Sequence, residues 1–234
     1  DQFLKKFPNS PLAERTSLSL GLLNIDKKNY LEASRKFNAH INNEKYKDKV
    51  SVDYAQLGLM YSLSKLSQTE QAIGLAEQIE KKSKNQLVKA EAAFRKADIY
   101  MNDEKYILAF NQYTESLKKY PNMVQLFPNA YFNKMEALFR TQKPVPAHSA
   151  ALEFVQMFPT HEFAPYALTR VGELLEIISA DQTKPTGAFL ETHFRYGDNP
   201  KTIIARLHLL STRMKSMKEQ ELKETIQKMN DLSA

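Results

Sequence analysis

Phe7–Leu23 reads FPNSPLAERTSLSLGLL, and Phe158–Leu175 reads FPTHEFAPYALTRVGELL. In each stretch a Phe-Pro pair precedes a glycine, and the glycine (Gly21 or Gly172) follows the proline by 13 positions. Proline cannot continue a helix but is accepted in a helix's first turn, so each pair is typical of a junction between two helices. A junction that recurs in this way predicts an internal repeat of helices.

The period of the repeat is visible in two columns of small residues. The first column holds Gly21, Gly58, Ala97, Met135 and Gly172, which lie 37, 39, 38 and 37 residues apart. The second column holds Ala33, Ala72, Ala109 and Ala147, which lie 39, 37 and 38 residues apart. Two columns with one period predict pairs of helices whose small residues let the helix axes approach closely. Only Met135 departs from the small-residue pattern.

These residues resemble the tetratricopeptide repeat (TPR), whose pattern is W-x2-L-G-x2-Y, then A-x3-F, then P. The second repeat matches the first half of the pattern with Tyr54, Leu57, Gly58 and Tyr61. The third repeat matches most of it with Ala97, Tyr100, Ala109, Tyr113 and Pro121. The resemblance implies an all-α fold, a right-handed solenoid of about five TPR-like helix-turn-helix pairs with a C-terminal capping helix.

The sequence predicts a single solenoid domain over residues 1–234, in a segment of a longer protein. The repeats are expected at residues 11–47, 48–85, 86–121, 122–159 and 160–200, and the capping helix at residues 201–232. A solenoid end needs a polar outer face, which the charged last helix supplies. A coiled-coil seam for a partner is the alternative interpretation of that helix, because its first apolar residues alternate by four and three.

The N-terminal stretch also indicates a compartment. Phe-Pro-Asn-Ser-Pro-Leu-Ala followed by Leu-Gly resembles bacterial envelope TPR proteins of the outer-membrane assembly lipoprotein and Tol-Pal coordinator type. This resemblance implies a periplasmic or envelope-associated protein, while a cytoplasmic adaptor stays open. No apolar run approaches the roughly 18 residues that cross a bilayer, so the segment is not expected to be transmembrane.

Residues that carry chemistry are sparse or scattered. The sequence has no cysteine, which excludes disulfides and cysteine-bound metal. No two of its histidines stand three or four positions apart, the spacing that places a metal-binding pair on one helix face. No Gly-rich phosphate loop and no G-x-S-x-G motif occurs. The sequence therefore predicts no enzyme, no cofactor, no metal and no small-molecule substrate.

The net charge of +6 permits contact with nucleic acid, which has to be weighed against a protein partner. Helical-repeat proteins that read nucleic acid place polar side chains at equivalent positions of successive repeats. Here the equivalent positions change character, and no arginine recurs in register. Nucleic acid is therefore disfavoured, and another protein is the expected partner.

A solenoid of this kind presents the first helix of each pair on a concave face, which suits a peptide or a partner helix. The residue after each member of the first column belongs to that face: Leu22, Leu59, Asp98, Glu136 and Glu173. Its expected neighbours are Leu18, Ile25, Phe94, Met101, Phe132, Phe139, Arg140, Tyr166 and Arg170. The three successive acids of this column predict a partner with a basic or amphipathic segment, because their fields overlap within about a Debye length.

Overall fold

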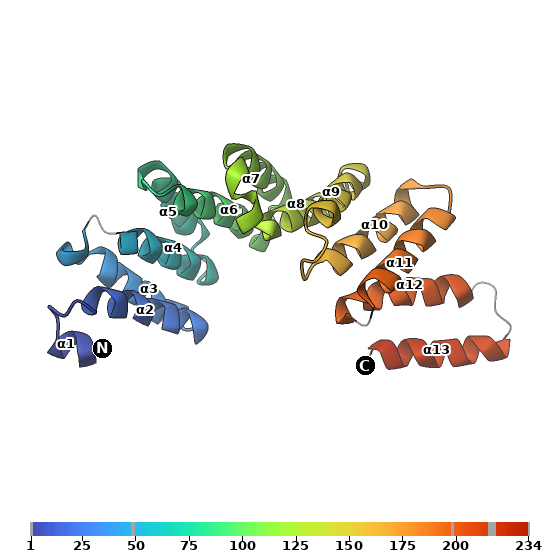
Figure 1. The fold of residues 1–234 in the computed structure, drawn as a ribbon, viewed down its shortest axis with the longest axis horizontal. Helices are drawn as coiled ribbons and strands as arrows, with labels where there is room; N and C mark the ends of the chain where they lie inside the picture. Colours follow the sequence, from blue (N-terminus) through green and yellow to red (C-terminus); the bar gives the residue numbers. More distant parts are fainter. Residues whose placement is uncertain (1, 48–49, 198, 215–218, 234) are drawn as a thin grey trace. The chain divides into compact units, whose positions relative to one another are not determined.

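The computed structural model describes residues 2–47, 50–197, 199–214 and 219–233. Every regular element in these ranges is a helix, which confirms the all-α repeat fold (Figure 1). The helices group into two compact units, and the single domain predicted over residues 1–234 stays a prediction. Unit 1 is Asp1–Phe127 and unit 2 is Pro128–Ala234.

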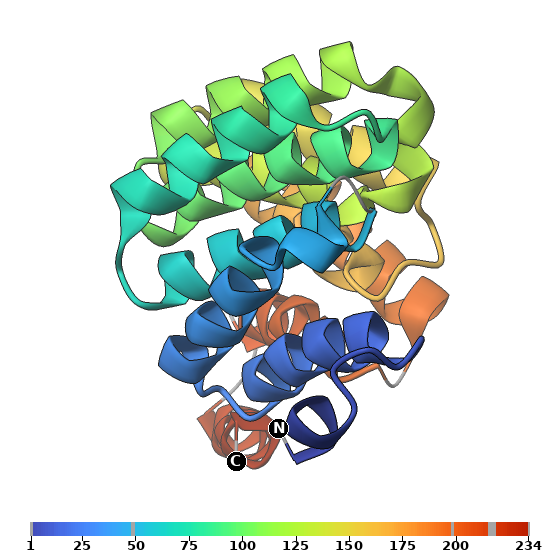
Figure 2. The same ribbon diagram turned by 90° about the vertical axis from the view of Figure 1, so that its left-hand side faces the viewer.

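Unit 1 contains the first three helix pairs. Its elements are α1 (Gln2–Lys6), α2 (Ala13–Asp26), α3 (Tyr30–Ile41), η1 (Glu44–Tyr46), α4 (Val50–Lys65), α5 (Thr69–Lys82), α6 (Gln86–Asn102), α7 (Tyr106–Lys119) and η2 (Pro121–Leu126). The helices α2, α4 and α6 are the A helices of their pairs, and α3, α5 and α7 are the B helices. Figure 2 brings α1, α2 and α3 to the front.

The A helices of unit 1 form one continuous row. Helix α4 packs against both α2 and α6, and the B helices α3 and α5 each pack against the A helices before and after them. The short turn inside each pair contains one residue in the left-handed backbone region, at Lys28, Ser67 and Glu104. Because these turns have the same geometry, each B helix returns along its A helix in the same way.

The two glycines of the first column make room for one aromatic ring. A Cβ added at Gly21 would lie 2.6 Å from Cδ1 of Phe37, and one added at Gly58 would lie 2.6 Å from Cε1 of the same ring. Phe37 is fully buried and belongs to a cluster with Ala33 and Ala55. The glycines are therefore needed so that α2 and α4 can both press on α3, as the repeat pattern predicts.

Unit 2 contains the fourth and fifth pairs and the C-terminal helices. Its elements are α8 (Pro128–Arg140), α9 (Pro144–Met157), α10 (Ala164–Ile178), α11 (Thr183–Tyr196), η3 (Pro200–Thr202), α12 (Ile203–Met214) and α13 (Glu219–Ser233). In unit 2 a glycine of the first column again makes room for an aromatic ring, because a Cβ added at Gly172 would lie 2.6 Å from Cδ1 of Phe189.

The predicted capping helix over residues 201–232 is wrong as a single element. The described residues form two helices, α12 and α13, and the two pack against each other (Figure 1). Arg206 of α12 and Lys228 of α13 line one cavity, which a single straight helix could not allow at 1.5 Å rise per residue. Of the apolar residues that alternate by four and three at the start of the predicted helix, Met217 lies outside the described residues.

His40 of α3 is a buried titratable group at the edge of unit 1. Its Nε2 lies 3.0 Å from Oγ of Ser51, and its ring stacks on Tyr46 with 4.6 Å between centroids. Its Nδ1 is buried and has no hydrogen-bond partner among the described residues. Burial lowers the pKa of His40, against a smaller opposing effect from the charge of Glu14. A second proton would place an unsatisfied N–H in the interior.

This pKa shift gives the stability a pH dependence. The unfolded chain binds a proton at His40 near pH 6.5, and the folded chain only at lower pH. The free energy of unfolding should therefore fall as the pH drops below about 6.5. In His40→Phe this part of the pH slope should vanish, as urea unfolding between about pH 7 and pH 5 would measure. An unchanged slope in the variant would contradict the assignment.

Candidate functional site

The row of A helices in unit 1 contains a groove of about 450 Å³. Three elements line it: α2 supplies Leu18, Leu22 and Ile25, α4 supplies Tyr54, Leu57, Gly58 and Tyr61, and α6 supplies Glu91 and Arg95. Two large side chains there are open to solvent, with Leu22 47 % and Tyr54 40 % exposed. An apolar surface held on rigid helices and open to solvent can receive an apolar segment of another molecule.

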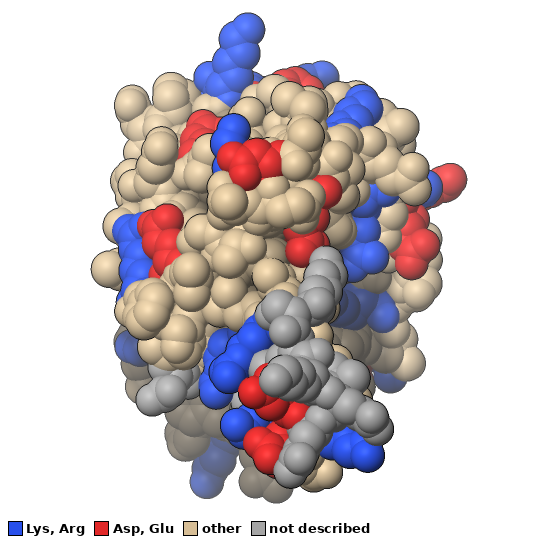
Figure 3. Space-filling model, turned by 90° about the vertical axis from the view of Figure 1, so that its right-hand side faces the viewer, with Lys and Arg blue, Asp and Glu red and all other residues tan. Residues whose placement is uncertain are grey.

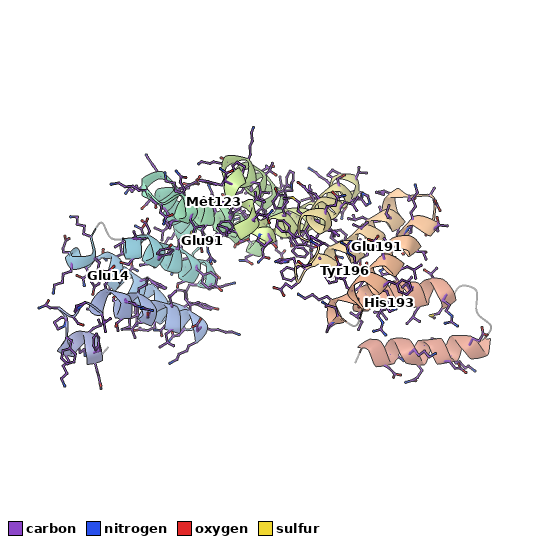
Figure 4. All side chains as sticks on the ribbon, viewed as in Figure 1. Glu14, Glu91, Met123, Glu191, His193 and Tyr196 are labelled. Carbon is purple, nitrogen blue, oxygen red and sulfur yellow. The ribbon has the colours of Figure 1, made fainter. Side chains whose placement is uncertain are left out.

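The α6 side of this groove is charged. Glu91, labelled in Figure 4, accepts a hydrogen bond from Nε of Arg95 at 2.8 Å, and its Oε1 forms an ion pair with Nη2 of Arg95 at 2.7 Å. The guanidinium of Arg95 lies 5.7 Å from the centre of the Tyr61 ring, and Nζ of Lys65 lies 5.4 Å from the same centre. The cationic ends of Arg95 and Lys65 therefore both lie beside the Tyr61 ring, at the end of the groove.

Three of the predicted contact residues, Leu18, Leu22 and Ile25, line this groove as expected for one face of α2. Leu59 and Phe94 do not, since they are 8 % and 3 % exposed. Leu59 belongs to the cluster around Phe37, and the Phe94 ring lies 4.8 Å from that of Phe127. The position one residue after the glycine therefore turns towards the interior in the second repeat.

The remaining predicted residues of unit 1 lie further along α6. Asp98 is half-buried and accepts a short hydrogen bond from the hydroxyl of Tyr113. It lines a small cavity of about 40 Å³ that shares Tyr61 and Arg95 with the groove. Met101 is half-buried near the end of the helix. Asp98 thus lies on the predicted face, with its carboxylate already bound within the chain.

In unit 2 four predicted residues come together around a fifth, Arg170 of α10. The Nε of Arg170 donates to Glu136 of α8 at 2.9 Å, Nη1 donates to Glu173 at 2.5 Å, and Nη2 donates to the Tyr166 hydroxyl at 2.6 Å. The guanidinium also lies 4.1 Å from the ring centre of Phe139. These residues, which the sequence predicts to contact a partner, bind one another and join α8 to α10.

Burial and charge act in opposite directions on the Arg170 cluster. Burial lowers the pKa of the Arg170 guanidinium, but hydrogen bonds and attraction from Glu136 and Glu173 outweigh it and raise that pKa above its usual value. Burial, with a further contribution from the charge of Glu136, raises the pKa of the Tyr166 hydroxyl. The cluster is therefore a fixed ion network at neutral pH, with Arg170 fully charged.

His208 of α12 extends this network towards the end of the chain. Its ring stacks on Phe189 of α11, with 4.4 Å between centroids and 14° between planes. Its Nε2 lies 3.7 Å from Oε1 of Glu173, and its Nδ1 lies 3.2 Å from Oε1 of Glu176. The contact could not be read from the sequence, because it depends on how α12 returns over α10 and α11.

The last two predicted contact residues, Phe132 and Arg140, lie in different environments. Phe132 of α8 stacks on Phe163 with 4.7 Å between centroids, and its edge meets Phe154 and Tyr166. Arg140 is exposed at the end of α8. Phe132 therefore belongs to the packing between the fourth and fifth pairs, and Arg140 to the surface.

A second cavity, of about 460 Å³, lies between α11, α12 and α13. Its lining mixes two leucines with charged and titratable groups: His193, Arg206, Leu209, Leu210, Lys228 and Asp231. His193, labelled in Figure 4, has a buried Nδ1 with no hydrogen-bond partner among the residues that the structure describes. The single helix predicted over residues 201–232 would not bring Arg206 and Lys228 to one cavity, so the sequence did not indicate this site.

Other kinds of site find little support in the described part of the chain. No group of three or more His, Asp or Glu side chains there is arranged to hold a metal ion. None of the described helices combines the length and the apolarity needed to span a membrane. On the face shown in Figure 3, basic and acidic side chains lie interspersed among uncharged ones. That face offers no continuous basic surface for a phosphate backbone.

Comparison with solved structures identifies the fold. MamA (residues 41 to the end) from Desulfovibrio magneticus RS-1 is similar, with 15 % identity and a TM-score of 0.59 over 79 % of this chain and 97 % of that one. A tetratricopeptide repeat protein from Parabacteroides merdae ATCC 43184 has 11 % identity and a TM-score of 0.59, over 96 % of this chain and 87 % of that one.

A third similar structure is Bacillus thuringiensis PlcR in complex with the peptide PapR7 and DNA, with 13 % identity and a TM-score of 0.56 over 84 % of this chain and 73 % of that one. No protein-family model matches the sequence, and no curated protein matches it significantly. At these identities the comparisons establish a TPR-like helical-repeat fold.

Proposed function

We propose that this protein is a non-enzymatic scaffold that binds a segment of another protein in the groove of unit 1. The observation that carries the proposal is the row of exposed and half-exposed apolar side chains on α2 and α4, with Leu22 and Tyr54 open to solvent. A groove between rigid A helices suits an amphipathic helix, which anchors by apolar residues one helical turn apart.

The comparisons support the same function more generally. The PlcR structure of the same fold contains the peptide PapR7, and it also contains DNA. We favour a protein partner, because the groove is mainly apolar and its charged residues include the paired acid Glu91. Phosphate recognition would instead require several unpaired cations along the surface.

We further propose that the protein works in an envelope-associated assembly, as the resemblance of the N-terminal repeat to envelope TPR proteins suggests. A cytoplasmic adaptor of the same fold is the alternative. Fractionation of cells that produce the full-length protein from its own gene would decide, with expected recovery in the periplasmic or membrane fraction. Recovery in the cytoplasm alone would contradict the proposed location.

The binding function can be tested by site-specific photo-crosslinking. A photoreactive amino acid placed at Leu22 should form a crosslink to a partner protein in nuclease-treated extracts of the source cells, because that side chain faces the groove. The matched control is Leu31 of α3, which is 51 % exposed but does not line the groove. Crosslinks of equal yield and identity at both positions would contradict binding in the groove.

A further inference from the structure

The groove has an apolar part and a charged part, and the two are on different helices. Leu18, Leu22 and Ile25 follow one another by four and three residues and form a ridge along α2. Glu91 and Arg95 stand on α6, with Tyr61 of α4 beside Arg95. A segment that fills the groove must therefore present apolar side chains to α2 and polar ones to α6.

The accessible charge on the α6 side is positive. Within the Glu91–Arg95 pair the arginine side chain is 40 % exposed and the glutamate only 22 %. Lys65 is exposed beside the same tyrosine, and no carboxylate of the described residues lies within salt-bridge distance of it. The nearby Asp98 carboxylate keeps its negative charge, but it is half-buried and its hydrogen bond from the buried Tyr113 hydroxyl directs it towards α7. On the solvent side an incoming group therefore meets the exposed ends of Arg95 and Lys65 first.

This arrangement favours a partner of the opposite charge to the basic segment that the sequence predicts. The prediction of a basic segment depended on Asp98, Glu136 and Glu173 acting as free acids. In the structure Asp98 is bound by Tyr113, and both glutamates are bound by Arg170. A cationic segment would have to compete with these internal partners, which are already desolvated and in place.

We propose that the partner segment is an acidic amphipathic helix, with its apolar stripe on the α2 ridge and its carboxylates between Arg95 and Lys65. This inference rests on the proposed function and adds the chemistry of the partner. Arg95 and Lys65 select the segment through charge, and the ridge anchors it through apolar contact. Charge complementarity of this kind acts mainly on the association rate and on partner choice.

The test uses two synthetic helical peptides of about 18 residues that share a Leu stripe at positions i, i+4 and i+7. One peptide has Glu on the side of the helix that would face α6, and the other has Lys at the same positions. Binding of each to the whole chain is measured by fluorescence anisotropy at low and at high salt. The variant Arg95→Gln with Lys65→Gln removes the two cations, and Leu22→Asp disrupts the ridge.

The matched control removes two positive charges elsewhere in unit 1, with Lys81→Gln and Lys82→Gln on the exposed end of α5. The Glu peptide should bind about tenfold more tightly than the Lys peptide at low salt, and the preference should shrink at high salt. The Arg95/Lys65 variant should lose that preference, while the Lys81/Lys82 variant should keep it.

The outcomes separate this inference from the proposed function. Equal binding of both peptides, lost in Leu22→Asp, would overturn the acidic preference and leave the groove as a binding site. Tighter binding of the Lys peptide would overturn it as well. If neither peptide binds, this inference fails, and the proposed function is then judged by the Leu22 crosslink alone.

Discussion

Replacing Phe37 with alanine should lower the free energy of unfolding by about 3–5 kcal/mol, the range for removing a large buried aromatic ring. The ring is fully buried, and it touches both glycines of the first column, Gly21 on α2 and Gly58 on α4. Its loss leaves a cavity where three helices meet, and neighbouring backbone cannot collapse fully into it. Urea unfolding followed by circular dichroism would measure the change.

The glycine side of the same contact provides a sharper test. Gly58→Ala should destabilise by about 1–3 kcal/mol, because the added methyl group overlaps the Phe37 ring. The matched control is Gly74→Ala in the middle of α5, where a Cβ meets nothing within 4 Å. That change should stabilise by roughly 0.5–1 kcal/mol, since alanine is the better helix former.

A double-mutant cycle then links the two residues. In a Phe37→Leu background the smaller side chain leaves space, so Gly58→Ala should be less harmful than in the wild type. Additive effects of the two changes would mean that the repeat column is small for a reason other than the Phe37 ring.

Arg170→Met should be similarly harmful to unit 2, by about 3–5 kcal/mol, because it leaves two covered carboxylates without their cation. The side chains of Arg170, Glu136 and Glu173 are only 14 %, 12 % and 19 % exposed. Three hydrogen bonds to Glu136, Glu173 and Tyr166 are lost together. Thermal and urea unfolding at about pH 7 would measure the loss.

A surface arginine in the same unit is the matched control for this change. Arg195 pairs with Glu191 at 3.3 Å, and the two side chains are 40 % and 57 % exposed. Arg195→Met should therefore change the stability by less than about 1 kcal/mol. An equal loss of stability in the two variants would contradict a larger contribution of the Arg170 network to the free energy of unfolding.

The sequence by itself determined the repeat and most of the helices. Small residues at one period, such as Gly58 and Ala109, can be recognised because close helix packing restricts residue size at fixed positions. The α2 side of the groove could also be predicted from the sequence, since Leu18, Leu22 and Ile25 follow the spacing of one helix face. These features depend on neighbours within one repeat or the next.

The tertiary structure alone decided which predicted contacts face solvent. Leu59 and Phe94 occupy the same repeat column or face as Leu22, yet they are buried, because Leu59 packs in the cluster around Phe37 and Phe94 packs against Phe127. From the sequence, Arg170 could pair with a partner or with Glu136. The choice depends on the spatial distance between two residues 34 positions apart, which the sequence does not give. The packing of α12 against α13 likewise could not be predicted. The local spacing of apolar residues is the same in one long helix as in two shorter helices, so it does not distinguish them.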